Sequence, residues 1–222
     1  MTISNESRGA IKKDFEPIAL GMGRLGLTPD ALTLIGFAIT VLGAVLLAAN
    51  LWLVGGIVVF LGGAFDMFDG TLARATGKVS KLGAFMDSVF DRWGEAVVYL
   101  GIVIGGELAG HTRVPILATA ALGAAFMVSY ARAKSEGLGF STGTGMAAVG
   151  IMPREVRLVI LSLGLIFADA PNIKALEIAL GIIAVGATIT VIQRILYVRG
   201  QAQHQPNQSP AAQQPGSNGE TQ

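Results

Sequence analysis

Cysteine is absent from this chain of 222 residues, and only two histidines are present. The lack of thiols excludes disulfide bonds and thiol catalysis, and with so few nitrogen and sulfur ligands we expect no zinc site. Charged residues are also scarce, at 14%, and the formal net charge is +1. Nucleic-acid-binding proteins carry clustered basic residues with interleaved aromatics, so this composition predicts no nucleic-acid partner.

Hydrophobic residues are abundant where charges are few. They make up 52% of the chain, and the mean hydropathy is +0.60. This is too apolar for a soluble domain of this length, so we expect an integral membrane protein. Residues 1–16 are polar and lack the apolar centre of a cleavable signal peptide. The first membrane span is therefore expected to serve as the targeting signal.

Apolar stretches recur along the chain at roughly the 20-residue length that an α-helix needs to cross a bilayer. We predict an all-α fold with six transmembrane helices, at residues 30–49, 51–74, 80–105, 114–133, 153–168 and 175–198. Basic and apolar side chains in 11–24 predict an amphipathic helix on the membrane surface. The expected domains are a cytoplasmic N-terminus with this helix (1–29), the transmembrane domain (30–199) and a disordered cytoplasmic tail (200–222).

Basic residues are distributed unequally between the two ends of these spans. Arg113 and Lys174 fall on one side, whereas nearly all the others fall on the side that holds both termini. The positive-inside rule makes that side cytoplasmic and predicts a multi-pass protein of the cell membrane. Arg92 lies inside a span, and we expect it to form a local ion pair with Glu95.

Four aspartates recur at helical spacing in otherwise apolar sequence: Asp66, Asp69, Asp87 and Asp91. Residues three or four positions apart share one face of a helix. The short segment 75–80 suits a tight connection between antiparallel helices, so we expect two acidic stripes that face each other. Carboxylates are costly in apolar surroundings, and a hard divalent cation such as Mg²⁺ would offset their charge. The pattern therefore predicts a metal site.

Small and basic residues lie on the same helix faces as these aspartates. Gly70, Ala73 and Gly83 leave room for a bulky ligand close to the helix backbones. Arg74 offers a planar fork of donors that suits a phosphate group. The combination predicts a phosphate-transfer site.

A second group of basic residues is expected at the cytoplasmic ends of the last three spans. Lys134, Arg154 and Arg194 would lie beside the aspartates, and cations held together repel one another unless an anion joins them. A phosphate on a substrate would meet that need. The alternative of side chains that only extend to the membrane surface stays open for three further residues, Arg132, Arg157 and Arg199.

The aspartate segment carries a family resemblance. It matches DxxDGxxAR, eight residues, then GxxxDxxxD at every specified position from Asp66 to Asp91, and so resembles the CDP-alcohol phosphotransferase family. Segments 129–139, 150–158 and 191–194 are similar to the phosphatidylinositol phosphate synthases of that family. Those proteins usually have an ERPER-like run, whereas this chain has PREVR at 153–157, which keeps two arginines three residues apart.

The resemblance implies a phospholipid-biosynthesis transferase in the membrane that moves a phosphatidyl group from CDP-diacylglycerol to an alcohol, releasing CMP. The expected acceptor is inositol phosphate, and a homodimer is implied. Two Mg²⁺ or Mn²⁺ ions would be held by Asp66, Asp69, Asp87 and Asp91, with Asp91 also the general base. The CDP-lipid would contact Asp69, Gly70, Ala73, Arg74, Gly83 and, in a PxxxT segment that the family shares, Pro29 and Thr33. The acceptor phosphate would contact Lys134, Arg154 and Arg194.

Other functions remain open from the sequence. The acceptor could be glycerol 3-phosphate or another alcohol, although the basic residues favour a phosphorylated one over serine. A transporter for a divalent metal or an organic anion would also place carboxylates in the membrane. Transport sites usually lie near the midplane between repeats, whereas the motif residues here gather at one face. Four intact aspartates disfavour an inactive scaffold.

Overall fold

The computed structural model describes residues 17–140, 145–169 and 174–204, and every regular element within these ranges is helical. A short helix at 17–24 comes first. It is followed by α2 (Pro29–Ala48), α3 (Trp52–Ala75), α4 (Lys81–Leu108), α5 (Val114–Gly137), the 3₁₀ turn η1 (Met146–Ala148), α6 (Arg154–Ile166) and α7 (Ala175–His204). The predicted all-α class is confirmed, and each predicted span overlaps one of α2 to α7. The rest of the predicted surface helix (11–16) and of the tail (205–222) lies outside the described residues.

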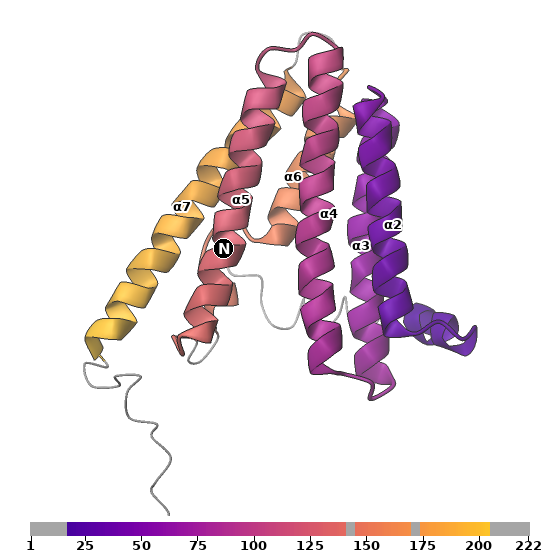
Figure 1. The fold of residues 1–222 in the computed structure, drawn as a ribbon, viewed down its shortest axis with the longest axis vertical. Coiled ribbons are helices and arrows are strands. Elements are labelled where there is room, and N and C mark those ends of the chain that lie inside the picture. The colour runs from indigo at the N-terminus through magenta and orange to yellow at the C-terminus, as the bar shows by residue number, and fades with distance from the viewer. Residues whose placement is uncertain (1–16, 141–144, 170–173, 205–222) are drawn as a thin grey trace, which may run out of the picture.

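Local sequence signals explain where the helices that carry the aspartates begin. The side chain of Thr28 caps α2 by accepting a hydrogen bond from the Ala31 amide at 3.2 Å, and Pro29 occupies the first turn. The side chain of Ser80 caps α4 by accepting from the Gly83 amide at 2.9 Å. The turn before Ser80 reverses the chain, so α3 and α4 run antiparallel as predicted (Figure 1).

The helices form two groups with the short α6 between them (Figure 1). α2 packs against both α3 and α4, α5 packs against α4 and α7, and α6 packs against α3 and α7. Although α3 and α4 follow each other in the chain, they share few contacts because both lie on α2. Side chains from α6 can therefore contact the inner faces of α3 and α4.

The largest apolar cluster lies in the half of the bundle away from the motif. It is built from residues near the short connections that follow α2, α4 and α6, such as Leu47, Ile102 and Leu165. Close approach of α4 to α2 depends on Gly101 and Gly105, where a Cβ atom would collide with backbone carbonyl oxygens of α2.

Within the described ranges, four helices are long and apolar enough to cross a membrane: α2, α3, α5 and α7. This agrees with an integral membrane protein but is fewer than the six predicted spans. α4 has 28 residues, but charged side chains interrupt its apolar sequence. α6 has only 13 residues, or roughly 20 Å of helix at 1.5 Å per residue, against a hydrocarbon core of about 30 Å. In Figure 1 its first turn lies inside the bundle, well above the end where α4 begins.

Candidate active site

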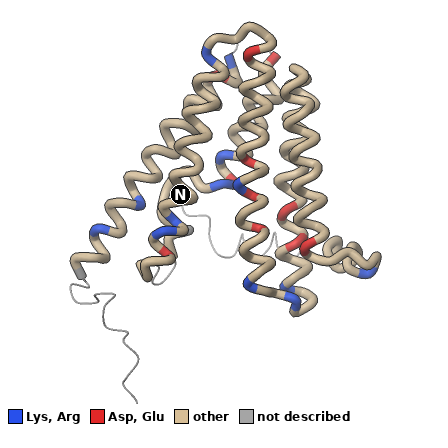
Figure 2. The backbone as a smooth tube through the Cα atoms, in the orientation of Figure 1, with Lys and Arg blue, Asp and Glu red and all other residues tan. Residues whose placement is uncertain are grey.

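Charged residues of α3, α4 and α6 lie partway along the bundle, as the red and blue segments of the backbone in Figure 2 show. Asp66 and Asp69 come from α3, and Asp87 and Asp91 come from α4. Asp91 is ten residues beyond the start of α4, about 15 Å along its axis. Asp69 is buried at 5% exposure, and the other three aspartates are partly buried. The site therefore lies inside the bundle, away from the end where α4 begins.

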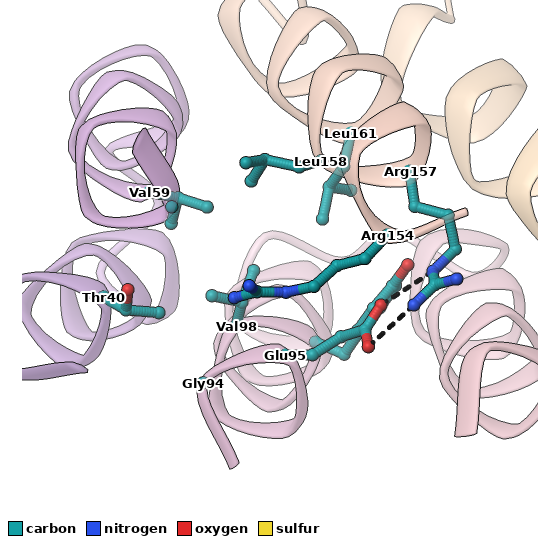
Figure 3. A pocket seen from close by; sticks show the side chains of 11 residues that line it. Thr40, Val59, Gly94, Glu95, Val98, Arg154, Arg157, Leu158 and Leu161 are labelled. Carbon is teal, nitrogen blue, oxygen red and sulfur yellow. Dashed lines mark hydrogen bonds and ion pairs between the residues drawn. The ribbon is translucent and has the colours of Figure 1, made fainter. Parts of the chain in front are cut away.

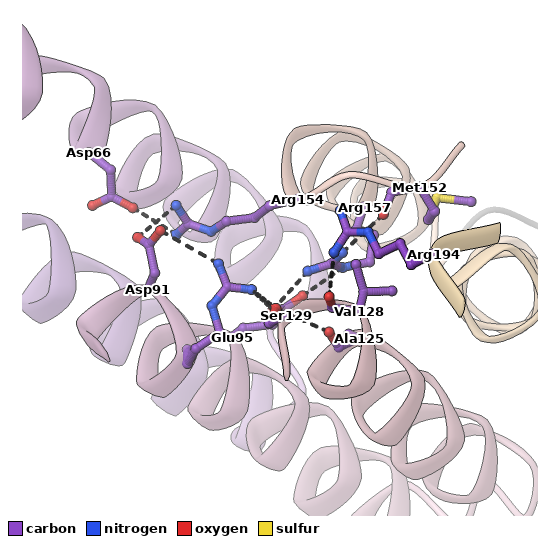
Figure 4. Close-up of polar contacts among 11 residues, drawn as sticks. Asp66, Asp91, Glu95, Ala125, Val128, Ser129, Met152, Arg154, Arg157 and Arg194 are labelled. Atoms are coloured by element: carbon purple, nitrogen blue, oxygen red, sulfur yellow. Dashed lines mark hydrogen bonds and ion pairs between the residues drawn. The ribbon is translucent and has the colours of Figure 1, made fainter. Parts of the chain in front are cut away.

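Arg154 joins the two acidic helices. Its Nη2 atom lies 2.8 Å from Asp66 Oδ2, and its Nη1 atom lies 2.7 Å from Asp91 Oδ1 (Figure 4). Because Asp66 belongs to α3 and Asp91 to α4, a single guanidinium group bridges the two stripes. The predicted convergence of the stripes is thus visible in the structure, through a residue that the sequence had assigned to the acceptor phosphate.

Asp69 is held in place by hydrogen bonds from its surroundings. Thr33 Oγ1 of α2 lies 2.6 Å from Asp69 Oδ2 and 3.2 Å from the carbonyl oxygen of Pro29. The other oxygen, Oδ1, accepts from the amide of Gly70. The PxxxT segment therefore meets the aspartate motif directly, as its predicted role in the same pocket requires.

Glycine makes room for a second aspartate. A Cβ atom at Gly36 of α2 would lie 2.7 Å from Asp66 Oδ1, which is too close for an ordinary contact. Gly36 is not among the site residues predicted from the sequence. Its signal was weak, because a glycine in an apolar transmembrane helix is common and only the position of α3 gives it meaning.

The remaining residues predicted for the CDP-lipid lie near the end of α3 and the start of α4. Arg74 is exposed in the last turn of α3, with its guanidinium over the backbone of Gly70 and its Nη2 atom 3.3 Å from Thr71 Oγ1. Ala73 is partly buried beside it. Gly83 lies in the first turn of α4, where a Cβ atom would be 3.5 Å from Asp30 Oδ1.

The three cations predicted for the acceptor phosphate have different surroundings. Arg154 is ion-paired within the aspartate site. Arg194 of α7 is buried, and it donates hydrogen bonds to the carbonyl oxygens of Val149, at 3.0 Å, and Val128. Lys134 is exposed in the last turn of α5 and makes no ion pair with another described residue. Their roles in binding stay predictions.

A buried ion pair beside the site was not foreseen. Arg157 is 2% exposed, and its Nε and Nη2 atoms lie 2.8 and 3.0 Å from the two carboxylate oxygens of Glu95 (Figure 4). Arg157 does not extend to a membrane surface as the open alternative held. Arg92 pairs with Glu95 at 3.2 Å, as expected, and also donates to Ser129. The available signal was Glu95 itself, four residues after Asp91 on the same face of α4.

A small cavity of about 50 Å³ lies behind Arg154 and Arg157, lined on the other sides mainly by apolar residues such as Val98 and Leu161 (Figure 3). Ligand pockets for nucleotide-sized molecules usually measure several hundred Å³. This cavity suits one or a few waters and is too small for a nucleotide.

The donor set of the site suits a hard divalent ion. Among the described residues, no three carboxylate or imidazole side chains are grouped as a ready ion cage. However, the carboxylates of Asp66 and Asp91 converge on a common cation, the Arg154 guanidinium. All four motif aspartates offer oxygen atoms, which Mg²⁺ and Mn²⁺ prefer as ligands. The residues therefore fit such an ion.

The chain belongs to the CDP-alcohol phosphatidyltransferase family, whose model matches residues 26–195. These residues include every side chain of the site described above. The family predicted from the aspartate motif is confirmed. Membership makes this chain a membrane transferase and removes the transporter and the inactive scaffold as alternatives.

Two named relatives are similar to most of this chain. An archaetidylinositol phosphate synthase of Pyrococcus horikoshii is 36% identical over 188 residues, which cover 85% of this chain and 92% of the relative. A phosphatidylinositol phosphate synthase of Mycobacterium marinum is also 36% identical, over 197 residues that cover 86% of this chain and 82% of the relative.

Solved structures give the same result. The phosphatidylinositol phosphate synthase of Mycobacterium tuberculosis with CDP-DAG bound matches with a TM-score of 0.74 and 31% identity, covering 91% of this chain and 98% of that one. A structure of the same enzyme with manganese and citrate matches with a TM-score of 0.73 and 31% identity, covering 91% and 93%. The structural matches at 31% identity therefore support the family assignment.

Proposed function

We propose that this chain transfers the phosphatidyl group of CDP-diacylglycerol to a hydroxyl of inositol phosphate, giving phosphatidylinositol phosphate and CMP. The observation that carries the proposal is the junction of the family's aspartate motif with Arg154, which brings a cation suited to phosphate against the carboxylates. The relatives support a lipid product with an inositol phosphate head group, since the archaeal protein is named an archaetidylinositol phosphate synthase and the mycobacterial protein a phosphatidylinositol phosphate synthase. They differ in the name of the lipid.

In the proposed reaction, the acceptor hydroxyl oxygen attacks the β-phosphorus of the CDP-lipid. The bond from that phosphorus to the oxygen of CMP breaks, and the hydroxyl proton passes to the carboxylate of Asp91. Divalent ions at Asp66, Asp69, Asp87 and Asp91, two in number, would neutralise the diphosphate and stabilise the leaving oxygen. The interaction of Asp69 with Thr33 keeps that carboxylate fixed while substrates exchange.

Substrate binding is divided between the two ends of the site. Arg74 contacts the diphosphate of CDP, while Gly70, Ala73 and Gly83 leave space for the nucleotide near Pro29 and Thr33. The acceptor phosphate is held by Arg154 and Lys134. Arg194 donates a hydrogen bond to the backbone that precedes α6, and its positive charge attracts the phosphate. The predicted division of labour is consistent with the exposed positions of Arg74 and Lys134.

The membrane arrangement follows from the same division. All six helices α2 to α7 cross the cell membrane, with α6 as a short span, and the helix at 17–24 belongs to an amphipathic surface helix. Both termini and the site face the cytoplasm, where the water-soluble acceptor is available, and the acyl chains stay in lipid. Two chains form a homodimer.

The test is CMP release by the purified protein with CDP-diacylglycerol and Mg²⁺ or Mn²⁺. Inositol phosphate, free inositol, glycerol 3-phosphate and serine are offered in separate reactions, and CDP-archaeol replaces CDP-diacylglycerol in a parallel set. We expect release with inositol phosphate alone and faster release from the diacylglycerol lipid. Release with glycerol 3-phosphate instead would overturn the acceptor, and a strong preference for CDP-archaeol would overturn the lipid.

A further inference from the structure

Arg154 occupies the oxygen atoms that the proposed reaction needs. Both of its Nη atoms are engaged, one with Asp66 at 2.8 Å and one with Asp91 at 2.7 Å. The second oxygen of Asp91 lies 3.6 Å from Arg92. A carboxylate bonded in this way is a poor base, and a guanidinium with both outer nitrogens engaged has little left to offer a phosphate. The contacts of Arg154 must therefore change during the reaction cycle.

We propose that Arg154 couples the two halves of the site by exchanging one charged partner for another. A divalent ion that binds Asp66 and Asp91 displaces the guanidinium from those carboxylates. The released guanidinium then binds the phosphate of the acceptor. Ion and acceptor phosphate consequently bind cooperatively, although they need not share a ligand. This inference rests on the proposed function of the same site.

Charge balance favours such an exchange. Three carboxylates, of Asp66, Asp91 and Glu95, are interleaved with the guanidiniums of three arginines, Arg92, Arg154 and Arg157. Asp69 and Asp87, the other two motif aspartates, make the site net negative, so the two proposed divalent ions together create a positive surplus and repel Arg154 at short range. A phosphate dianion at the released guanidinium offsets that surplus, and each event therefore strengthens the other.

The surrounding structure permits the side chain to move without the helix. Arg154 is the first residue of α6, and its side chain is 30% exposed, so it has a path to solvent. The helix itself is anchored by Arg157, which is bonded to Glu95 and to the carbonyl oxygen of Met152 at 3.0 Å. Only the long side chain of Arg154 has to swing from carboxylates to phosphate.

The test measures Mn²⁺ binding by the intact protein in lipid nanodiscs, from the electron paramagnetic resonance signal of free Mn²⁺. Titrations are made with and without inositol phosphate, and with inorganic phosphate as a second probe. In the native chain we expect inositol phosphate to tighten Mn²⁺ binding by about tenfold, within the usual range of coupling between sites. Unchanged Mn²⁺ affinity would overturn the proposal.

Variants of Arg154 show whether the coupling depends on its guanidinium or on direct contact between the ion and the phosphate. Arg154→Gln is expected to bind Mn²⁺ more tightly than the native chain in the absence of phosphate, and to lose the tightening by inositol phosphate. Arg154→Lys keeps the charge and should retain part of the coupling. The matched control is Arg132→Gln, because Arg132 is an exposed arginine that pairs with Glu136 on α5. Coupling that persists in Arg154→Gln would contradict the exchange.

Two further measurements distinguish a failure of the exchange from a failure of the proposed function. The melting temperature of Arg154→Gln is recorded in EDTA and in Mn²⁺, and we expect a loss in EDTA that Mn²⁺ restores, because the ion replaces the missing cation. CMP release by the native chain is measured in the same preparation. Release without coupling would overturn the exchange alone, whereas neither release nor Mn²⁺ binding would overturn the proposed function as well.

Discussion

Arg157 of α6 and Glu95 of α4 form a two-point ion pair, with nitrogen to oxygen distances of 2.8 and 3.0 Å. Arg157 also donates to the carbonyl oxygen of Met152, so the pair fixes both the start of α6 and the segment before it. Arg154 is in the same helical turn as Arg157, so this pair determines which atoms the Arg154 guanidinium can reach.

Removing Arg157 should therefore destabilise the protein. Arg157→Met leaves Glu95 with less compensation in a buried position, and breaking a buried pair typically costs about 3 to 5 kcal/mol. We expect a clear fall in the melting temperature of the detergent-solubilised protein. Arg199→Met serves as the control, because Arg199 is exposed. Equal melting temperatures for the two variants would show that the pair is not structural.

Replacing Asp91 by Asn should abolish transfer while the fold is retained. The amide cannot accept the proton of the acceptor hydroxyl, and general-base catalysis alone contributes about 100-fold or more. CMP release is the measurement. Glu136→Gln is the control, since Glu136 is an exposed carboxylate paired with Arg132 at 2.9 Å. Full activity in Asp91→Asn would exclude Asp91 as the base.

The hydroxyl of Thr33 should matter for the CDP-lipid half of the site. Thr33→Val removes the 2.6 Å interaction with Asp69 and leaves a buried carboxylate with one partner fewer. Hydrogen bonds to charged groups contribute about 1.5 to 3 kcal/mol, so we expect kcat/KM for CDP-diacylglycerol to fall tenfold or more. Thr33→Ser retains the hydroxyl and should stay near the native value. If Ser and Val behave alike, the hydrogen bond has no role.

Lys134 and Arg194 should respond differently to the same substitution. Lys134→Gln should raise KM for inositol phosphate several-fold with little change in melting temperature, because Lys134 is exposed. Arg194→Gln removes charged donors from the carbonyl oxygens of Val149 and Val128, and should lower the free energy of unfolding by about 1.5 to 3 kcal/mol. An Arg194 variant with native stability and a raised KM would assign it to binding only.

The sequence predicted the elements that depend on local patterns. The long apolar runs predicted spans that begin at residues 30 and 80, next to the observed starts of α2 at Pro29 and α4 at Lys81. Helical spacing placed Asp66 and Asp91 on the faces that Arg154 joins, and the spacing of the motif residues was enough to identify the family.

Features that depend on distant partners could not be predicted. Arg157 and Glu95 are 62 positions apart, so the burial of Arg157 follows from how deeply α6 enters the bundle, which periodicity does not encode. Arg154 was expected beside a phosphate, because a sequence reveals charge but not the competing carboxylates within reach. Gly36 gained meaning only from the approach of Asp66.

Identification of the lipid product tests the proposed transfer reaction most directly. Purified protein is incubated with CDP-diacylglycerol, inositol phosphate and Mg²⁺, and the lipid is analysed by mass spectrometry while CMP is quantified. We expect a lipid that carries inositol and two phosphate groups, formed in equal amount with CMP. A product with a different head group, or CMP accompanied by phosphatidic acid alone, would contradict it.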